Sequence, residues 1–316
     1  MARTNNLTNF LTDVATAIKT KTGDSTAIPA SQFDTKIADI NTGNLSDEEY
    51  AEANTDLDNI LQGSTPTKVY PPDWSQIGYE DTPEDILEAF SHSKQIYDNW
   101  DNSITNLSNK FAGDRELKYL PLIDTHNATN MSSMFNGCNK IMTLPLLDTS
   151  NVTNMQVMFS SCTSLVEVPL FDTSKVTSMQ SMFSSCSKLE TIPLFDTSNV
   201  TNIASMFSGC SNLKTIPLLD TSNVTDIFFM FINCSKLKNV PVLDISKATN
   251  IMSMFTNCAA LSNESLNNIL AMCIGATSYT GTKSLFQIGL SSAQATICTG
   301  LSNWSAAQSA GWTTGY

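Results

Sequence analysis

Two kinds of potentially reactive side chain recur in this sequence at a fixed spacing of 24 residues. The first series, the Asp column, consists of Asp124, Asp148, Asp172, Asp196, Asp220 and Asp244. The second series, the Cys column, consists of Cys138, Cys162, Cys186, Cys210, Cys234 and Cys258. Aligned carboxylates are possible calcium ligands, and aligned thiols are able to form disulfides, bind zinc or work with a histidine in catalysis. The residues around each column decide between these chemistries.

Calcium binding requires several carboxylate or carbonyl oxygens that converge on one ion. Each copy of the repeat supplies one Asp beside two hydroxyl residues, in a stretch such as Asp-Thr-Ser-Asn. Asp and Ser side chains in such a stretch bond nearby backbone N–H groups and favour a turn. We therefore interpret the Asp column as turn caps rather than as a calcium ladder.

The Cys column is close enough, at the roughly 4.8 Å step between adjacent coils, for disulfides to be sterically possible. Synthesis in the cytoplasm and the tendency of free cysteine to be buried favour reduced thiols instead. The sequence has no CxxC pair and no neighbouring His with the spacing of a zinc site. We predict a structural column of buried thiols and expect no metal and no cofactor.

Catalytic motifs are not apparent. The two histidines are His92, in a predicted helix, and His126, in the turn of the first copy. There is no Gly-rich phosphate loop and no HExxH motif. Neighbouring acidic residues such as Glu84 and Asp85 fall in the first turns of predicted helices, where the helix dipole explains them. We expect that the protein is not an enzyme and has no catalytic or cofactor-binding residues.

The net charge of −13 argues against nucleic acid and against a bare anionic membrane as partners, because both require clustered Lys and Arg. The sequence contains no run of 18 apolar residues, so we predict no membrane-spanning helix. The first residues, MARTNNLTNFLTD, do not resemble a secretory signal peptide. The expectation is synthesis in the cytoplasm without membrane insertion.

The 24-residue repeat predicts a solenoid, because each unit buries its apolar face only against the next unit. Residues 103–262 contain one degenerate copy and six full copies, of which TIPLFDTSNVTNIASMFSGCSNLK at 191–214 is the clearest. In this copy we predict two short strands and one helical turn that directs Met206, Phe207 and Cys210 inward. The predicted fold class is α+β, a leucine-rich-repeat-type solenoid with a helical N-terminal segment and a cap at each end.

The flanking regions divide into three parts. Residues 1–62 contain three predicted helices and are interpreted as a segment for attachment and oligomerisation. Residues 63–102 form a linker and then a helix with Pro83 at its first position, which we interpret as the N-terminal lid of the stack. Residues 263–316 form a C-terminal cap. Its closing helix is predicted to have four residues on one face: Leu266, Ile269, Leu270 and Cys273.

The copies differ most at the two positions before the Met-Phe pair, and positions that are free to vary in a solenoid tend to face outward. We call this series the contact column. Its candidate contact residues are Gln156, Gln180, Phe228, Phe229 and Met252. The pair Phe228 and Phe229 is either an anchor for a ligand or subunit, or packs against the C-terminal cap.

The repeat LxxLPLLDTSNVTNMxxMFxxCxxL closely resembles the BspA-like class of bacterial leucine-rich repeats, which occurs in surface proteins and in phage proteins. The opening NLTNFLTDVATAIKTKTGDSTAIPASQFDTKI resembles the start of many tail and baseplate proteins from phages of Gram-positive hosts. The stretches YPPDWSQIGYEDTPEDILEAF, ESLNNILAMCIGATSYTGTK and AGWTTGY are similar to segments that flank such repeats there. The resemblance implies a structural protein of a virion, in the tail or baseplate.

From these observations we expect a non-enzymatic virion protein of the tail fibre, baseplate or receptor-binding type. Its partners would be other virion proteins through residues 1–62, a protein or glycan on the host surface, and copies of itself, with a trimer as one possibility. One alternative is a head fibre or decoration protein of the same kind of phage. Another is a bacterial adhesin or interaction protein with BspA-like repeats.

Overall fold

A computed structural model describes residues 83–121 and 123–315. These residues divide into two compact units. The first unit contains residues 83–100, 119–121 and 123, and the second contains residues 101–118 and 124–315. The attachment segment predicted at residues 1–62 and the linker that follows it up to residue 82 lie outside the described residues.

Helix α4 (Pro83–Asp98) is the helix of the first unit. It begins at Pro83, as predicted, because proline lacks an N–H group and the first turn of a helix has no acceptor for one. The buried Ser93 hydroxyl donates to the carbonyl of Ala89 at 2.8 Å and also to the carbonyl of Tyr119, within the same unit. The role of α4 as a lid of the stack stays a prediction.

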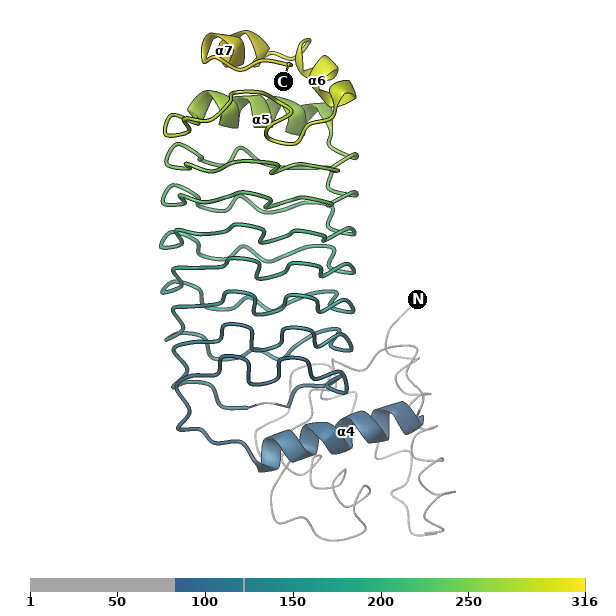
Figure 1. Cartoon of the computed structure of the whole chain (residues 1–316). Helices are drawn as coiled ribbons and strands as arrows, with labels where there is room; N and C mark the ends of the chain where they lie inside the picture. Colours follow the sequence, from purple (N-terminus) through teal and green to yellow (C-terminus); the bar gives the residue numbers. More distant parts are fainter. Residues whose placement is uncertain (1–82, 122, 316) are drawn as a thin grey trace, which may run out of the picture. The chain divides into compact units, whose positions relative to one another are not determined.

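The second unit is a stack of coils, which Figure 1 shows one above another, with α5, α6 and α7 after the last coil. Between the Asn and Cys positions of each coil, amides bond alternately to the next coil and within their own coil. For example, Phe183 N–H donates to Met206 O at 2.9 Å, whereas Met182 N–H donates to Met179 O at 3.1 Å. Every coil is therefore joined to its neighbour along this whole segment.

The predicted helical turn is wrong, because this segment consists of consecutive β-turns. Its internal bonds join residues three apart, and in each full coil two positions four residues apart have positive φ. In one coil these are Ser181 (φ 54°) and Ser185 (φ 63°). A left-handed residue at every fourth position interrupts a helix, so the backbone instead directs alternate amides to the next coil.

The predicted short strands are reduced to single bridges. In the second predicted strand, one parallel bridge per step joins residues at the Asn position. These residues are Asn106, Asn130, Asn154, Ser178, Asn202, Asp226 and Asn250. In the first predicted strand, the described residues contain only the bridge between Thr215 and Asn239. The proline in each copy removes an amide donor from this stretch, which limits pairing.

The core of the solenoid contains the inward residues that the repeat predicted. In the copy at 191–214, Met206, Phe207 and Cys210 have no exposed surface. Phenylalanine rings stack from coil to coil with centroids 5.5 to 5.8 Å apart. The stacked residues are Phe111, Phe135, Phe159, Phe183, Phe207, Phe231 and Phe255. Face-to-face burial of this kind makes each coil depend on its neighbours.

Helix α5 (Asn263–Gly275) follows the last coil, with the Ser262 side chain accepting from Ser265 N–H at its start. The predicted apolar face is confirmed, because Leu266, Ile269, Leu270 and Cys273 are all buried. Two shorter helices, α6 (Ser292–Cys298) and α7 (Trp304–Ser309), complete the chain. The Trp312 indole donates to Cys273 O at 2.8 Å and ties the end of the chain to α5.

The ladder of coils continues into the C-terminal region, which sequence analysis did not foresee. Ser253 N–H donates to Gln287 O at 2.7 Å, and Phe255 N–H donates to Ile288 O at 2.8 Å. Ser284 in turn pairs with Thr313 in a further parallel bridge. Residues 284–290 therefore cover the open edge of the last coil, which would otherwise expose unpaired backbone groups.

Candidate functional site

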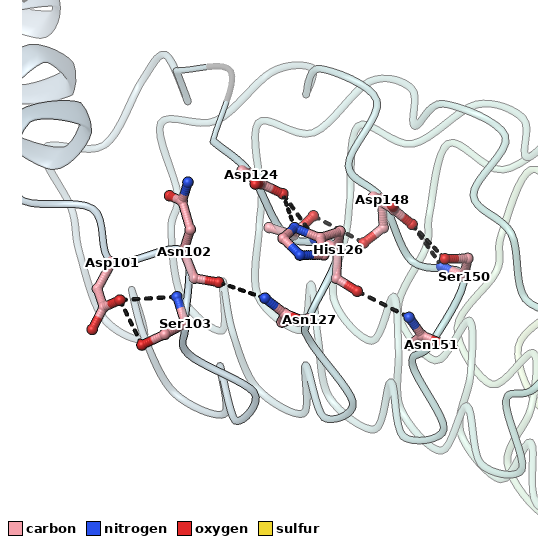
Figure 2. Close-up of polar contacts among 10 residues, drawn as sticks. Asp101, Asn102, Ser103, Asp124, His126, Asn127, Asp148, Ser150 and Asn151 are labelled. Carbon is pink, nitrogen blue, oxygen red and sulfur yellow. Dashed lines mark hydrogen bonds and ion pairs between the residues drawn. The ribbon is translucent and has the colours of Figure 1, made fainter.

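The Asp column lies in exposed turns, and its carboxylates bind groups of their own turns. Asp148 Oδ1 accepts from the Ser150 hydroxyl at 2.7 Å and from Ser150 N–H at 3.0 Å. These bonds, the hydroxyl bond first, lower the pKa of Asp148 below its usual value. Figure 2 shows this arrangement beside the equivalent contacts of Asp101 and Asp124. The geometry favours turn capping, and no group of three His, Cys, Asp or Glu suited to a metal occurs among residues 83–121 and 123–315.

Asparagine side chains link these turns along the stack. In Figure 2, Asn151 Nδ2 donates to His126 O at 2.9 Å, and Asn127 Nδ2 donates to Asn102 O at 3.0 Å. His126 Nδ1 lies 2.6 Å from Asp124 Oδ1, with both side chains exposed. This pair takes the place of the Ser–Asp contact in other coils, so its position is explained by the turn.

The Cys column is buried, with each thiol bonded to the backbone of the coil before it. Each Sγ donates to a phenylalanine carbonyl at 3.0 Å, as Cys186 does to Phe159. Burial raises the pKa of Cys210 to about 12, and the other thiols of the column shift upward for the same reason. A thiol that stays protonated at neutral pH and is covered by protein is a poor nucleophile.

The contact column is only partly exposed. Gln156, Gln180, Phe228 and Phe229 are half-buried, and Met252 is 39% exposed. The equivalent Ala204 is buried. Gln156 Nε2 donates to Ser178 Oγ of the next coil at 2.8 Å, so this side chain also joins two coils. The rings of Phe228 and Phe229 lie 4.9 Å apart with a 60° tilt. A role of this column in binding stays a prediction.

Phe286 extends the contact column beyond the last coil. Its N–H bonds to the Ser284 side chain two residues earlier, as Met252 N–H bonds to Asn250 and Phe228 N–H bonds to Asp226. The C-terminal end of the column therefore carries large apolar side chains at consecutive steps. Sequence analysis missed Phe286 because the 24-residue spacing is lost after Leu261.

Sequence analysis also missed a second surface, which is made of exposed apolar side chains. In five of the coils, the described residue directly after the proline is apolar and 46% to 65% exposed. We call this series the apolar stripe: Leu146, Leu170, Leu194, Leu218 and Val242. The residue after each of them, such as Leu147 or Phe171, is buried. The 24-residue spacing of the stripe was visible in the sequence, but the run Pro-Leu-Leu does not show which of its two leucines faces the core.

Comparison with known proteins places the repeat in a family. Residues 84–190 and 166–269 match the family described as Mycoplasma protein of unknown function, DUF285. The two matches together span more than half of the chain. The chain belongs to this family. DUF285 consists of BspA-like repeats, so the resemblance to BspA-like leucine-rich repeats is confirmed.

Two solved leucine-rich-repeat structures match parts of the chain. A leucine-rich-repeat protein of T. pallidum, TpLRR, is 17% identical and has a TM-score of 0.35 over 54% of this chain and 82% of its own. One from Bacteroides ovatus is 22% identical, with a TM-score of 0.28 over 49% of this chain and 44% of its own. No curated protein matches the chain.

Within the described residues, none of the helices is long and apolar enough to cross a bilayer.

Proposed function

We propose that this DUF285 repeat protein is a non-enzymatic binding protein of a phage particle, located in the tail or baseplate. Residues 1–62 would attach it to other virion proteins, and the solenoid would contact a protein or glycan on the host surface. The sequence resemblance of the opening and flanking stretches supports the virion part of this proposal. With many copies per particle, weak contacts add up to strong adhesion.

The apolar stripe carries the binding part of the proposal. Soluble monomers rarely expose a large contiguous apolar patch, and an exposed patch of this kind often marks an interaction surface. The core does not require these side chains, because the next residue of each coil already fills the inward position. Repetition over five successive coils gives the partner several equivalent contacts along the stack.

A paired-variant experiment tests this function. The double variant Leu170→Ser and Leu194→Ser removes two residues of the stripe. The control, Thr163→Ser and Lys188→Ser, changes two other surface residues that lie a few positions earlier in the chain. Leu170 and Leu194 are each about 60% exposed, so burying the exposed part of both side chains on binding contributes about 2 kcal/mol. We therefore expect the stripe variant to lose at least about tenfold in binding to host cells by flow cytometry. Undiminished binding by the stripe variant would overturn the proposal.

The location of the protein within the phage particle requires a separate measurement. Mass spectrometry of separated heads and tails from purified particles should find the chain in the tail fraction. A signal confined to heads would favour a head fibre or decoration protein, and absence from particles would favour a bacterial adhesin or interaction protein.

A further inference from the structure

One coil departs from the repeat at three neighbouring surface positions. Asp226 stands where the other coils have Asn or Ser, and Phe228 and Phe229 stand where most have small or polar residues. The inward residues of this coil keep the repeat pattern and stay buried: Ile227, Met230, Phe231 and Cys234. The departures therefore alter the surface of the coil without altering its core.

Phe229 occupies a backbone position that disfavours it. Its φ is 56°, and the equivalent residues of the other full coils are serines, with Val157 as the exception. A bulky side chain in this left-handed region is strained, and such strain is concentrated at functional sites. When one coil of a regular repeat carries a residue that its backbone conformation disfavours, a requirement other than folding is indicated.

The three residues combine a carboxylate with two aromatic rings. Asp226 Oδ1 accepts from Phe228 N–H at 3.4 Å, and the two rings lie 4.9 Å apart. Partial burial raises the pKa of Asp226, because desolvation disfavours its charged form. Among the described residues, no Lys, Arg or His forms an ion pair with this carboxylate. A partly dehydrated carboxylate beside aromatic rings attracts a cation.

We propose that Asp226, Phe228 and Phe229 form a binding site for a lysine side chain of a partner protein. The ammonium group would donate to the free acceptor sites of the Asp226 carboxylate, which a quaternary ammonium is unable to do. The lysine stem would lie on apolar surface, which Phe228, Phe229 and the adjacent Met252 provide. The net charge of −13 favours a partner with basic residues. This inference rests on the proposed function as a binding protein.

The site can be tested with n-hexylammonium as a probe of lysine and hexanol as its neutral counterpart. Both are titrated into the full-length protein while the Met252 methyl signal is followed by NMR. The variant Asp226→Asn restores the residue of the other coils, whose side chain makes the same turn bond. The control Asn130→Asp places a carboxylate four coils earlier, beside Ser132 and Ser133 instead of an aromatic pair and far from Asp226.

We expect the wild-type protein to bind n-hexylammonium more tightly than hexanol, and Asp226→Asn to weaken ammonium binding about tenfold without affecting hexanol. Asn130→Asp should leave ammonium binding unchanged. Equal ammonium binding by the wild type and Asp226→Asn would overturn the site. Tetramethylammonium that binds as tightly as n-hexylammonium would overturn the assignment to lysine.

The experiments distinguish failure of the lysine site from failure of the proposed host contact. If Asp226→Asn changes nothing while the apolar stripe variant loses host binding, only the lysine site is wrong. If the protein binds no host surface but Asp226 is required for ammonium binding, the site stands and the proposed host contact is wrong.

Discussion

Substituting Phe183 by alanine should destabilise the solenoid more than the same change at Phe255. Both side chains are buried, with at most 1% exposed, so the cost of removing the ring from the core is similar, about 3–5 kcal/mol. Phe183 stacks on three rings, Phe159, Phe195 and Phe207, whereas Phe255 stacks on Phe231. At about 0.5–1.5 kcal/mol per aromatic pair, two extra pairs add about 1–3 kcal/mol to the cost at Phe183.

Urea denaturation of the full-length protein, followed by far-UV circular dichroism, measures this difference. The slope of the transition must be equal in both variants, because a repeat array is able to unfold locally at one end. A half-buried surface ring, removed by Phe228→Ala, serves as the control and should cost under about 1 kcal/mol. Equal or reversed costs at Phe183 and Phe255, with equal slopes, would refute the view that stacking across coils contributes beyond burial.

Three further results are expected. Val157→Asn should raise the free energy of unfolding by about 1 kcal/mol, and Ser205→Val should lower it by a similar amount. A β-branched residue at φ near 57° is strained, whereas asparagine tolerates this conformation, as Asn109 does at the equivalent position. Unchanged melting temperatures of both variants would contradict this. All eight thiols are buried, so Ellman's reagent should react slowly with the native protein and fully after denaturation; a rapidly labelled thiol in the native state would count against the burial. Stability should be nearly constant between about pH 5 and pH 8 and fall at lower pH. Hydrogen bonds such as that from Ser198 lower the pKa of Asp196 below 3.8 in the folded state, so the unfolded chain binds protons first. Stability that rises on acidification below pH 4 would contradict this linkage.

Several features followed from the sequence because they depend on local pattern. The 24-residue period identified the coil, and the apolar residues Met206, Phe207 and Cys210 were placed correctly in the core. Pro83 marked the start of α4, and the spacing of Leu266 and its neighbours identified the buried face of α5. In each case a covalent constraint or a simple periodicity determines the result without knowledge of the neighbouring coil.

The candidate site was predictable only in part. Phe228 and Phe229 stood out in the sequence as aromatic exceptions, but Asp226 did not, since its significance comes from partial burial next to them. Phe286 became part of the contact column only because residues 284–290 bond to the last coil. The sequence does not show this because the segment joins the stack after a loop that breaks the register.

The sequence alone determined that the chain repeats, which residues of each copy are apolar, and therefore that successive copies stack. Only the tertiary structure decided that the segment through Met206 and Phe207 is a series of turns rather than a helix, and that Leu194 faces outward while Phe195 faces inward. The physical reason is that alternate amides of each coil find their acceptors on the neighbouring coil. The backbone conformation that this bonding requires sets the direction of the side chains between the Asn and Cys positions. Stacking on Phe171 and Phe183 of the preceding coil accompanies the inward direction of Phe195. No single copy of the repeat contains that information.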